Sequence, residues 1–117
     1  MSDSPTLQFL SVDLFFQSRV EGHCRACGFS MQQINRLDRI GPPETIRGLI
    51  VDLELPGLDF VRLGEILTAN QIPALGYGSH VKTHLFEAAR EAGIENLFSR
   101  GEIDARGAEI LQSCFAS

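Results

Sequence analysis

Short apolar runs alternate along the chain with longer segments in which apolar residues recur every three or four positions. The short runs are typical of buried strands, and the wider spacing is typical of helices that bury one face. The predicted strands span residues 7–12, 30–34, 48–52, 72–77 and 96–99. The predicted helices span residues 15–27, 60–70, 80–92 and 103–115, with Asp59 as the N-cap of the second. This alternation favours an α/β fold, in which helices cover both faces of a parallel sheet.

The connection between the second and third strands breaks the alternation. Residues 35–47 contain Gly41, Pro42 and Pro43 in succession. Proline removes a backbone donor and clashes with the preceding turn inside a helix. We therefore predict a loop here, with one helical turn at most.

Length and composition describe one ordinary globular domain. The chain has 117 residues, of which 44% are hydrophobic and 21% charged, enough to bury a core without disulfides. We expect a flexible N-terminus over residues 1–6 and one domain over residues 7–116. The formal net charge of −5 argues against nucleic acid and against an anionic membrane surface as partners.

Three cysteines and a polar N-terminus without a secretory signal favour the cytoplasm. Cys24 and Cys27 have the spacing of a redox motif, but they lie near the end of the first predicted helix, on its apolar stripe. A catalytic pair belongs at a helix N-terminus, where the helix dipole lowers the thiol pKa. We expect these cysteines to pack as small hydrophobic residues.

Candidate chemistry gathers where the predicted strands end. The carboxyl ends of parallel strands form the crevice in which such sheets bind ligands. Asp13, Asp52, Gly78 and Arg100 follow or end the first, third, fourth and fifth strands. Two carboxylates and a guanidinium there would suit a small ion or a phosphate, although an Asp after a strand is often only a turn or cap residue.

Residues 49–59 (LIVDLELPGLD) resemble the third strand and following loop of response-regulator receiver domains. Residues 9–13 resemble the family's first strand, residues 72–78 its fourth strand, and residues 91–100 the stretch that leads to its essential lysine. The match covers nearly the whole chain in order. The resemblance implies a flavodoxin-like, doubly wound sheet of five parallel strands in the order 2-1-3-4-5.

Carried over position by position, the resemblance makes Asp52 the candidate phosphoacceptor. It makes Asp13, Asp52 and the backbone carbonyl of Glu54 the candidate Mg²⁺ ligands. This chemistry is coherent, because a carboxylate that attacks a phosphoryl group needs a divalent cation and a fixed positive charge nearby.

Several positions depart from the family pattern. Leu14 replaces the second acid of the family's acidic pair, Gly78 replaces a Thr or Ser, Leu97 replaces the switch aromatic, and Arg100 replaces the lysine. Loss of a carboxylate weakens a Mg²⁺ site, so we expect weak Mg²⁺ binding and no other cofactor. Arg100 presents a planar fork that suits a carboxylate, so we expect it to pair with Asp52 or Asp13.

These departures favour a stand-alone pseudo-receiver, a signalling module that acts through protein contacts and in which phosphoryl switching at Asp52 is weakened or lost. Its partner would be a histidine kinase or a downstream signalling protein, and a homodimer is also compatible. By resemblance, the contact surface would comprise the fourth and fifth helices with the fifth strand. We expect no enzymatic activity, because no nucleophile–base pair is evident.

Two alternatives remain open. The first is a working phosphoacceptor response regulator of a two-component phosphorelay, with atypical switch residues. The second is a flavodoxin-like domain that binds a small ligand with the glycine-rich loop of residues 76–80 (GYGSH), where His80 lies beside the crevice.

Overall fold

The computed structural model describes residues 4–116, in which five strands alternate with four α-helices. The strands are β1 (Thr6–Leu10), β2 (Ser30–Ile34), β3 (Gly48–Asp52), β4 (Ala74–Gly78) and β5 (Asn96–Ser99). The helices are α1 (Leu14–Ala26), α2 (Phe60–Asn70), α3 (Thr83–Glu91) and α4 (Arg100–Phe115). The strands form one parallel sheet in the order β2-β1-β3-β4-β5, which confirms the predicted fold.

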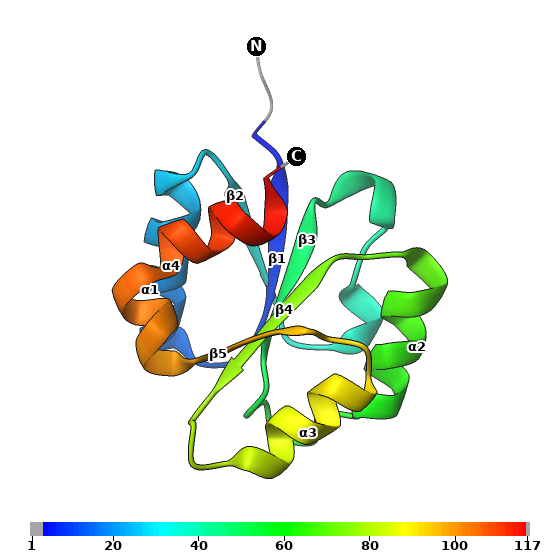
Figure 1. Cartoon of the computed structure of the whole chain (residues 1–117). Coiled ribbons are helices and arrows are strands. Elements are labelled where there is room, and N and C mark those ends of the chain that lie inside the picture. The colour runs from blue at the N-terminus through cyan, green and yellow to red at the C-terminus, as the bar shows by residue number, and fades with distance from the viewer. Residues whose placement is uncertain (1–3, 117) are drawn as a thin grey trace.

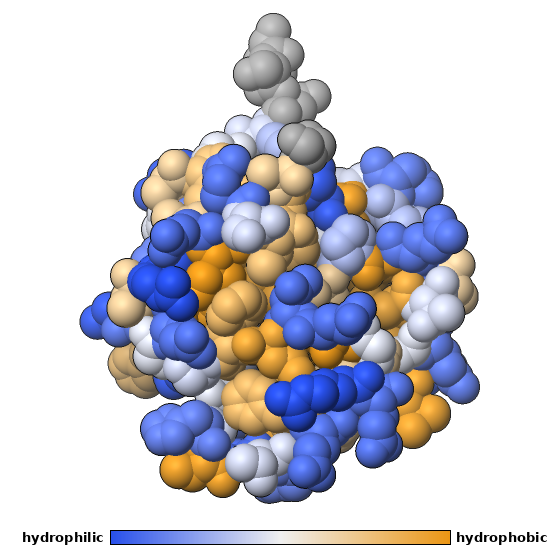
Figure 2. Space-filling model, viewed as in Figure 1, coloured by the Kyte–Doolittle hydropathy of each residue, from blue (hydrophilic) through white to orange (hydrophobic). Residues whose placement is uncertain are grey.

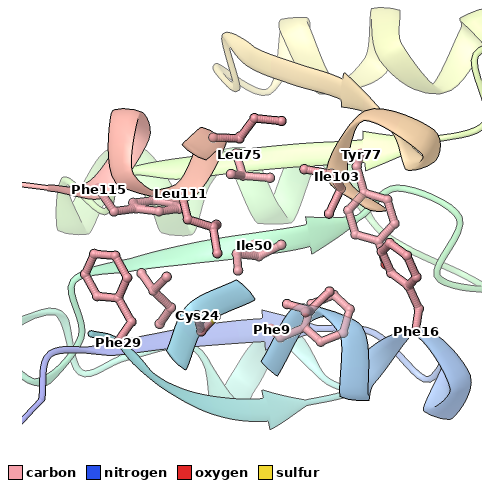
Figure 3. Packing of buried hydrophobic residues seen from close by; sticks show 13 residues of the cluster. Phe9, Phe16, Cys24, Phe29, Ile50, Leu75, Tyr77, Ile103, Leu111 and Phe115 are labelled. Carbon is pink, nitrogen blue, oxygen red and sulfur yellow. The ribbon is translucent and has the colours of Figure 1, made fainter. Parts of the chain in front are cut away.

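Helices α1 and α4 cover one face of the sheet, and α2 and α3 cover the other (Figure 1). Each face therefore has its own apolar core. The core under α1 and α4 includes several aromatic rings, among them Phe9, Phe16, Phe29, Tyr77 and Phe115. Figure 3 shows the rings of Tyr77 and Phe16 side by side at the end toward which β3 points, with Phe29 and Phe115 at the opposite end. The core under α2 and α3 is mainly aliphatic.

No α-helix connects β2 to β3. Residues 35–47 instead contain two 3₁₀ turns, Leu37–Arg39 and Pro43–Thr45, where we predicted one turn at most.

The sheet beneath this connection carries amides where a packed helix would meet apolar side chains. Gln8 of β1 is buried, and its Nε2 donates to Gln32 Oε1 at 2.9 Å. The Gln8 amide also donates to the carbonyl of Arg39 and accepts from the backbone N–H of Gly41. One glutamine therefore fastens the connection to the sheet.

Several predicted boundaries shift by one to three residues. β1 begins at Thr6, which pairs with Ser30, so the segment expected to be flexible shares Thr6 with the sheet; residues 1–3 lie outside the described part. α3 begins at Thr83 instead of residue 80, because residues 79–82 form a turn closed by the Lys82 N–H on the Ser79 carbonyl.

The last helix also begins earlier than predicted, at Arg100 instead of residue 103. Ser99 accepts from the N–H of Glu102, and the Glu102 carboxylate accepts from the N–H of Ser99. This reciprocal capping box satisfies donors at the start of the helix. It places Arg100 in the first turn of α4.

The cysteines pack as expected. Cys24 is fully buried in the core under α1, and burial raises the pKa of its thiol to about 12. A thiol held in its protonated form is a poor nucleophile, which agrees with a packing role for Cys24. Within residues 4–116, no helix is both long and apolar enough to cross a bilayer.

Candidate functional site

Asp52 ends β3 and is buried at the carboxyl edge of the sheet. Its Oδ2 accepts a hydrogen bond from Ser11 Oγ at 2.7 Å, and its Oδ1 accepts one from the backbone N–H of Glu54 at 3.0 Å. Burial raises the pKa of this carboxyl above its usual value, and the two hydrogen bonds partly oppose that shift. Each oxygen of the candidate phosphoacceptor therefore accepts one hydrogen bond.

Ser11 is a site residue that our sequence reasoning missed. Its side chain is fully buried, donates to Asp52, and accepts from the backbone N–H of Asp13 at 3.0 Å. It thereby connects the end of β1 to the end of β3. The available signal was a hydroxyl within an apolar strand, because a buried polar group needs a partner.

Asp13 has two roles in this structure: it caps a helix and it pairs with a cation. Its Oδ1 accepts from the backbone N–H groups of Phe15 and Phe16, which makes it the N-cap of α1. Its Oδ2 forms an ion pair with Arg100. The hydrogen bond from Arg100 and those from the helix amides hold the pKa of the Asp13 carboxyl below its usual value.

Arg100 pairs with Asp13, one of the two acids we expected, and not with Asp52. Its guanidinium carbon also lies 4.3 Å from the centre of the Phe16 ring, within the range of a cation–π interaction. Ser99 caps α4 and Asp13 caps α1, and the ion pair joins the starts of these two helices. The cation is thus fixed between an acid and an aromatic ring.

Glu54 enters the site through its side chain. Its Oε1 lies 2.8 Å from Lys82 Nζ, and its Oε2 accepts from the backbone N–H of Ser79 at 2.9 Å. The Lys82 hydrogen bond is the largest cause of a lowered pKa at this carboxyl. Lys82 is a second cation that we did not anticipate, because it lies outside the motifs that resemble the family.

Gly78 is buried at the end of β4, yet packing does not require a glycine there. A Cβ at this position would lie 3.5 Å from Leu53 Cβ and 3.8 Å from the Glu54 side chain, which are ordinary contacts. At Gly76, by contrast, a Cβ would lie 2.9 Å from Leu53 Cδ2. Gly76 therefore permits close packing, whereas Gly78 leaves room beside the crevice.

The glycine-rich segment is mostly strand. Residues 76–78 belong to β4 and are buried, so the predicted ligand-binding loop is confined to Ser79 and His80. The Tyr77 hydroxyl is buried and has no hydrogen-bond partner within residues 4–116. Leu97, the last of the altered switch positions, is half-buried in β5 and packs against the core under α2 and α3.

The site fits a divalent cation poorly. Within the described residues, no three His, Cys, Asp or Glu side chains lie together as a metal site. The Asp13 carboxylate is paired with Arg100, so one of the two candidate carboxylate ligands already carries a cation. This arrangement agrees with the weak Mg²⁺ binding expected from Leu14.

Comparisons with known proteins identify the fold. No protein-family model and no curated protein matches the chain in sequence. Among solved structures, a protein assigned as a response regulator from Chloroflexus aurantiacus matches with a TM-score of 0.80 and 18% identity, covering 98% of this chain and 100% of that chain. The receiver domain of a sensor histidine kinase from Pseudomonas aeruginosa, with a magnesium ion coordinated in its active-site cleft, matches with a TM-score of 0.79, 18% identity and the same coverage.

A response regulator from Thermotoga maritima matches with a TM-score of 0.77 and 15% identity, again covering 98% of this chain and 100% of that chain. At these identities the likeness concerns the fold. The chain has the fold of response-regulator receiver domains.

Proposed function

We propose that this protein is a receiver-like signalling module that acts through protein contacts, and that phosphoryl switching at Asp52 is weakened or lost. The observation that carries the proposal is the ion pair between Arg100 and Asp13. It neutralises the carboxylate that the family resemblance assigns to the metal, and it uses the cation that the resemblance assigns to the phosphoryl group.

The surroundings of Asp52 support the same conclusion. Transfer of a phosphoryl group to a carboxylate requires nearby positive charge to stabilise the transition state. Both oxygens of Asp52 are hydrogen-bonded, and the two cations of the crevice are paired with Asp13 and Glu54. Within the described residues both cations are therefore already committed to Asp13 and Glu54, which leaves Asp52 as the unpaired acid of the crevice.

We propose that Mg²⁺ binds this crevice weakly. The Pseudomonas aeruginosa domain holds Mg²⁺ in its cleft, and the corresponding ligands here would be Asp13, Asp52 and the backbone carbonyl of Glu54. Leu14 contributes an apolar, exposed side chain where another carboxylate would help, and a Mg²⁺ ion would have to displace Arg100 from Asp13.

We propose that protein contacts use the face formed by α3, β5 and α4. A cavity of about 450 Å³ on this face has an apolar part formed by Phe86, Leu97 and Phe98. Figure 2 shows apolar atoms gathered there, between α4 and α3, with polar side chains around them. An apolar centre with a polar rim is the usual composition of a protein interface. The partner would be a histidine kinase or a downstream signalling protein, and the module itself would have no enzymatic activity.

Intact-mass analysis after incubation with Mg²⁺ and acetyl phosphate tests the proposal. We expect no stoichiometric adduct on the wild-type protein. The variant with Leu14→Asp, Gly78→Thr and Arg100→Lys restores the family residues and serves as the matched control. A stoichiometric wild-type adduct that disappears in Asp52→Ala would overturn the proposal and establish a working phosphoacceptor.

A further inference from the structure

A hollow lies beside β1 and β2, where a helix between β2 and β3 would otherwise cover the sheet. It measures about 900 Å³ and is bounded on its other side by the first part of the connection of residues 35–47. This volume lies within the usual range of small-molecule sites. Most side chains that line the hollow are polar, and four of them are amides, Gln8, Gln32, Gln33 and Asn35. A ligand that fits this hollow must therefore offer hydrogen-bonding groups of its own.

Backbone groups fix the orientation of the buried Gln8 amide. Its Oε1 accepts from the N–H of Gly41 at 2.9 Å, and a backbone N–H can only donate. Its Nε2 donates to the carbonyl of Arg39 at 3.1 Å, and a carbonyl can only accept. Exchanging the amide oxygen and nitrogen would break both hydrogen bonds, so the Gln8 amide has one orientation.

This orientation decides what Gln32 offers to the hollow. Gln8 Nε2 also donates to Gln32 Oε1 at 2.9 Å, which leaves Gln32 Nε2 without an acceptor among residues 4–116. Gln33 is fixed in the opposite sense, because its Nε2 donates to the backbone carbonyl of Ser11 at 2.9 Å. Its Oε1 has no donor in the same part of the chain. The hollow therefore offers an amide donor from Gln32 and an amide acceptor from Gln33.

We propose that this hollow binds a small heterocycle with an amide edge, in which a ring N–H and a carbonyl lie side by side, as in uracil and guanine. Gln32 donates to the ring carbonyl, and Gln33 accepts from the ring N–H. The flat faces of the ring contact the apolar part of the lining, which includes Val12, Ile34 and Ile40.

Arg39 indicates that the ligand also carries an anionic group. Its side chain lines the hollow, is exposed and has no ion-pair partner within residues 4–116. Asp38, the acid in the lining, is paired with Arg36. A guanidinium binds phosphate or carboxylate through charge-assisted hydrogen bonds. A nucleoside monophosphate whose base is uracil or guanine would therefore bind the two amides and Arg39 together.

Ser11 links the hollow to the candidate site. Its carbonyl accepts from Gln33, and its hydroxyl donates to Asp52 at 2.7 Å. Ser11 alone separates Gln33 from the Asp52 carboxylate in this series of hydrogen bonds. The ligand site does not depend on the proposed function, because it requires neither phosphorylation of Asp52 nor its loss.

Calorimetric titration of the wild-type protein with uridine monophosphate and with guanosine monophosphate tests the proposal. We expect at least one of them to bind with a dissociation constant below about 1 mM. The matched ligand is the same nucleotide methylated at the ring N–H, which keeps the ring, the carbonyls and the phosphate. It should bind at least about tenfold more weakly, because the Gln33 carbonyl loses its hydrogen bond. Absence of binding by both nucleotides at about 1 mM, or equal binding of the methylated form, would overturn the proposal.

The variant Gln32→Met removes the amide donor but leaves Gln8 its bonds to Arg39 and Gly41. It should weaken binding of the nucleotide by roughly tenfold. Gln112→Met is the matched control, since Gln112 is exposed on α4 and does not line the hollow, and it should leave the affinity unchanged. Equal affinities of the wild type and Gln32→Met would overturn the assigned contact.

Two further measurements check the phosphate and the location. Nucleosides, which have no phosphate, should bind more weakly than the nucleotides, and Arg39→Gln should remove that difference. Amide chemical shifts should change in β2 and in residues 35–42 when the nucleotide is added. Changes confined to the glycine-rich segment of residues 76–80, or to another surface, would show that the ligand binds elsewhere and would overturn the proposal.

Discussion

Arg100 and Asp13 form an ion pair that joins the first turn of α4 to the N-cap of α1 across the carboxyl edge of the sheet. The pair is only partly exposed, and the guanidinium also contacts the Phe16 ring. The two helices pack against each other along the same face. Arg100 therefore has a structural role, because it holds α1 and α4 together at the carboxyl edge of the sheet.

Arg100→Ala should reduce the free energy of unfolding by about 1–2 kcal/mol, because it removes both the ion pair and the cation–π contact. The control is Arg106→Ala, which removes exposed pairs with Glu102 and Glu109 on the same helix and should have an effect below about 0.5 kcal/mol. Urea denaturation without Mg²⁺ measures both. Equal losses of unfolding free energy in the two variants would show that the Arg100 contacts stabilise the protein no more than exposed surface pairs do.

Asp52→Asn should stabilise the protein at neutral pH. Burial raises the folded-state pKa of Asp52 above the unfolded value of about 3.9, so the folded state binds the proton more tightly. The wild-type protein therefore loses stability as the pH rises from the unfolded value through the raised folded value, and asparagine avoids that loss. The Asn amide can donate to Ser11 Oγ, whose hydroxyl can turn.

The expected gain is about 1 kcal/mol at pH 7, and it should vanish below about pH 4. Denaturation of both proteins across this pH range provides the measurement. If Asp52→Asn is the less stable protein at pH 7, then the Asp52 carboxylate is stabilised by a positive charge, and Arg100 is the nearest candidate.

Leu14→Asp should strengthen Mg²⁺ binding by roughly tenfold or more, because it restores a carboxylate where the family has its acidic pair. Position 14 is the first residue of α1, where a negative charge is also favourable by a few tenths of a kcal/mol. Phe15→Asp is the matched control, since it adds the same charge at the next residue of α1, which is also exposed. Calorimetry that finds the same affinity in all three proteins would rule out the assumed alignment at Asp13 and Leu14.

Tyr77→Phe should raise the free energy of unfolding by about 1 kcal/mol. Within residues 4–116 the hydroxyl is buried without a partner, and an unsatisfied buried polar group is unfavourable by about 1–3 kcal/mol. The ring itself, which lies 5.2 Å from that of Phe16, would keep its packing. Thermal and chemical denaturation both measure the change. A loss of stability would indicate that the hydroxyl bonds to a buried water molecule.

The order of elements could be predicted because the periodicity of apolar residues depends directly on which face each element buries. The bounds of β2, β3 and β5 were predicted to the residue for this reason. The early start of α4 could also have been found, since Ser99 and Glu102 have the spacing of a capping box.

Less of the candidate site could be predicted from the sequence. The position of Asp52 at a strand end was predictable, but the choice of Asp13 as the partner of Arg100 depends on how α1 and α4 meet. Ser11 and Lys82 were missed because their partners lie 41 and 28 residues away along the chain. Side-chain pairs at such separations are set by tertiary packing.

The single amide of Gln8 has a consequence for how the protein opens. A helix packed on a sheet is released only when its whole apolar face becomes exposed, whereas residues 35–47 are fastened by the hydrogen bonds of Gln8 and by the partly buried side chains of Leu37, Ile40 and Ile46. Releasing them requires little of the free energy of global unfolding, so this segment should form its own low-stability unit in amide hydrogen exchange. Exchange there would proceed through brief local openings, while the strands on either side of Asp52 remain protected.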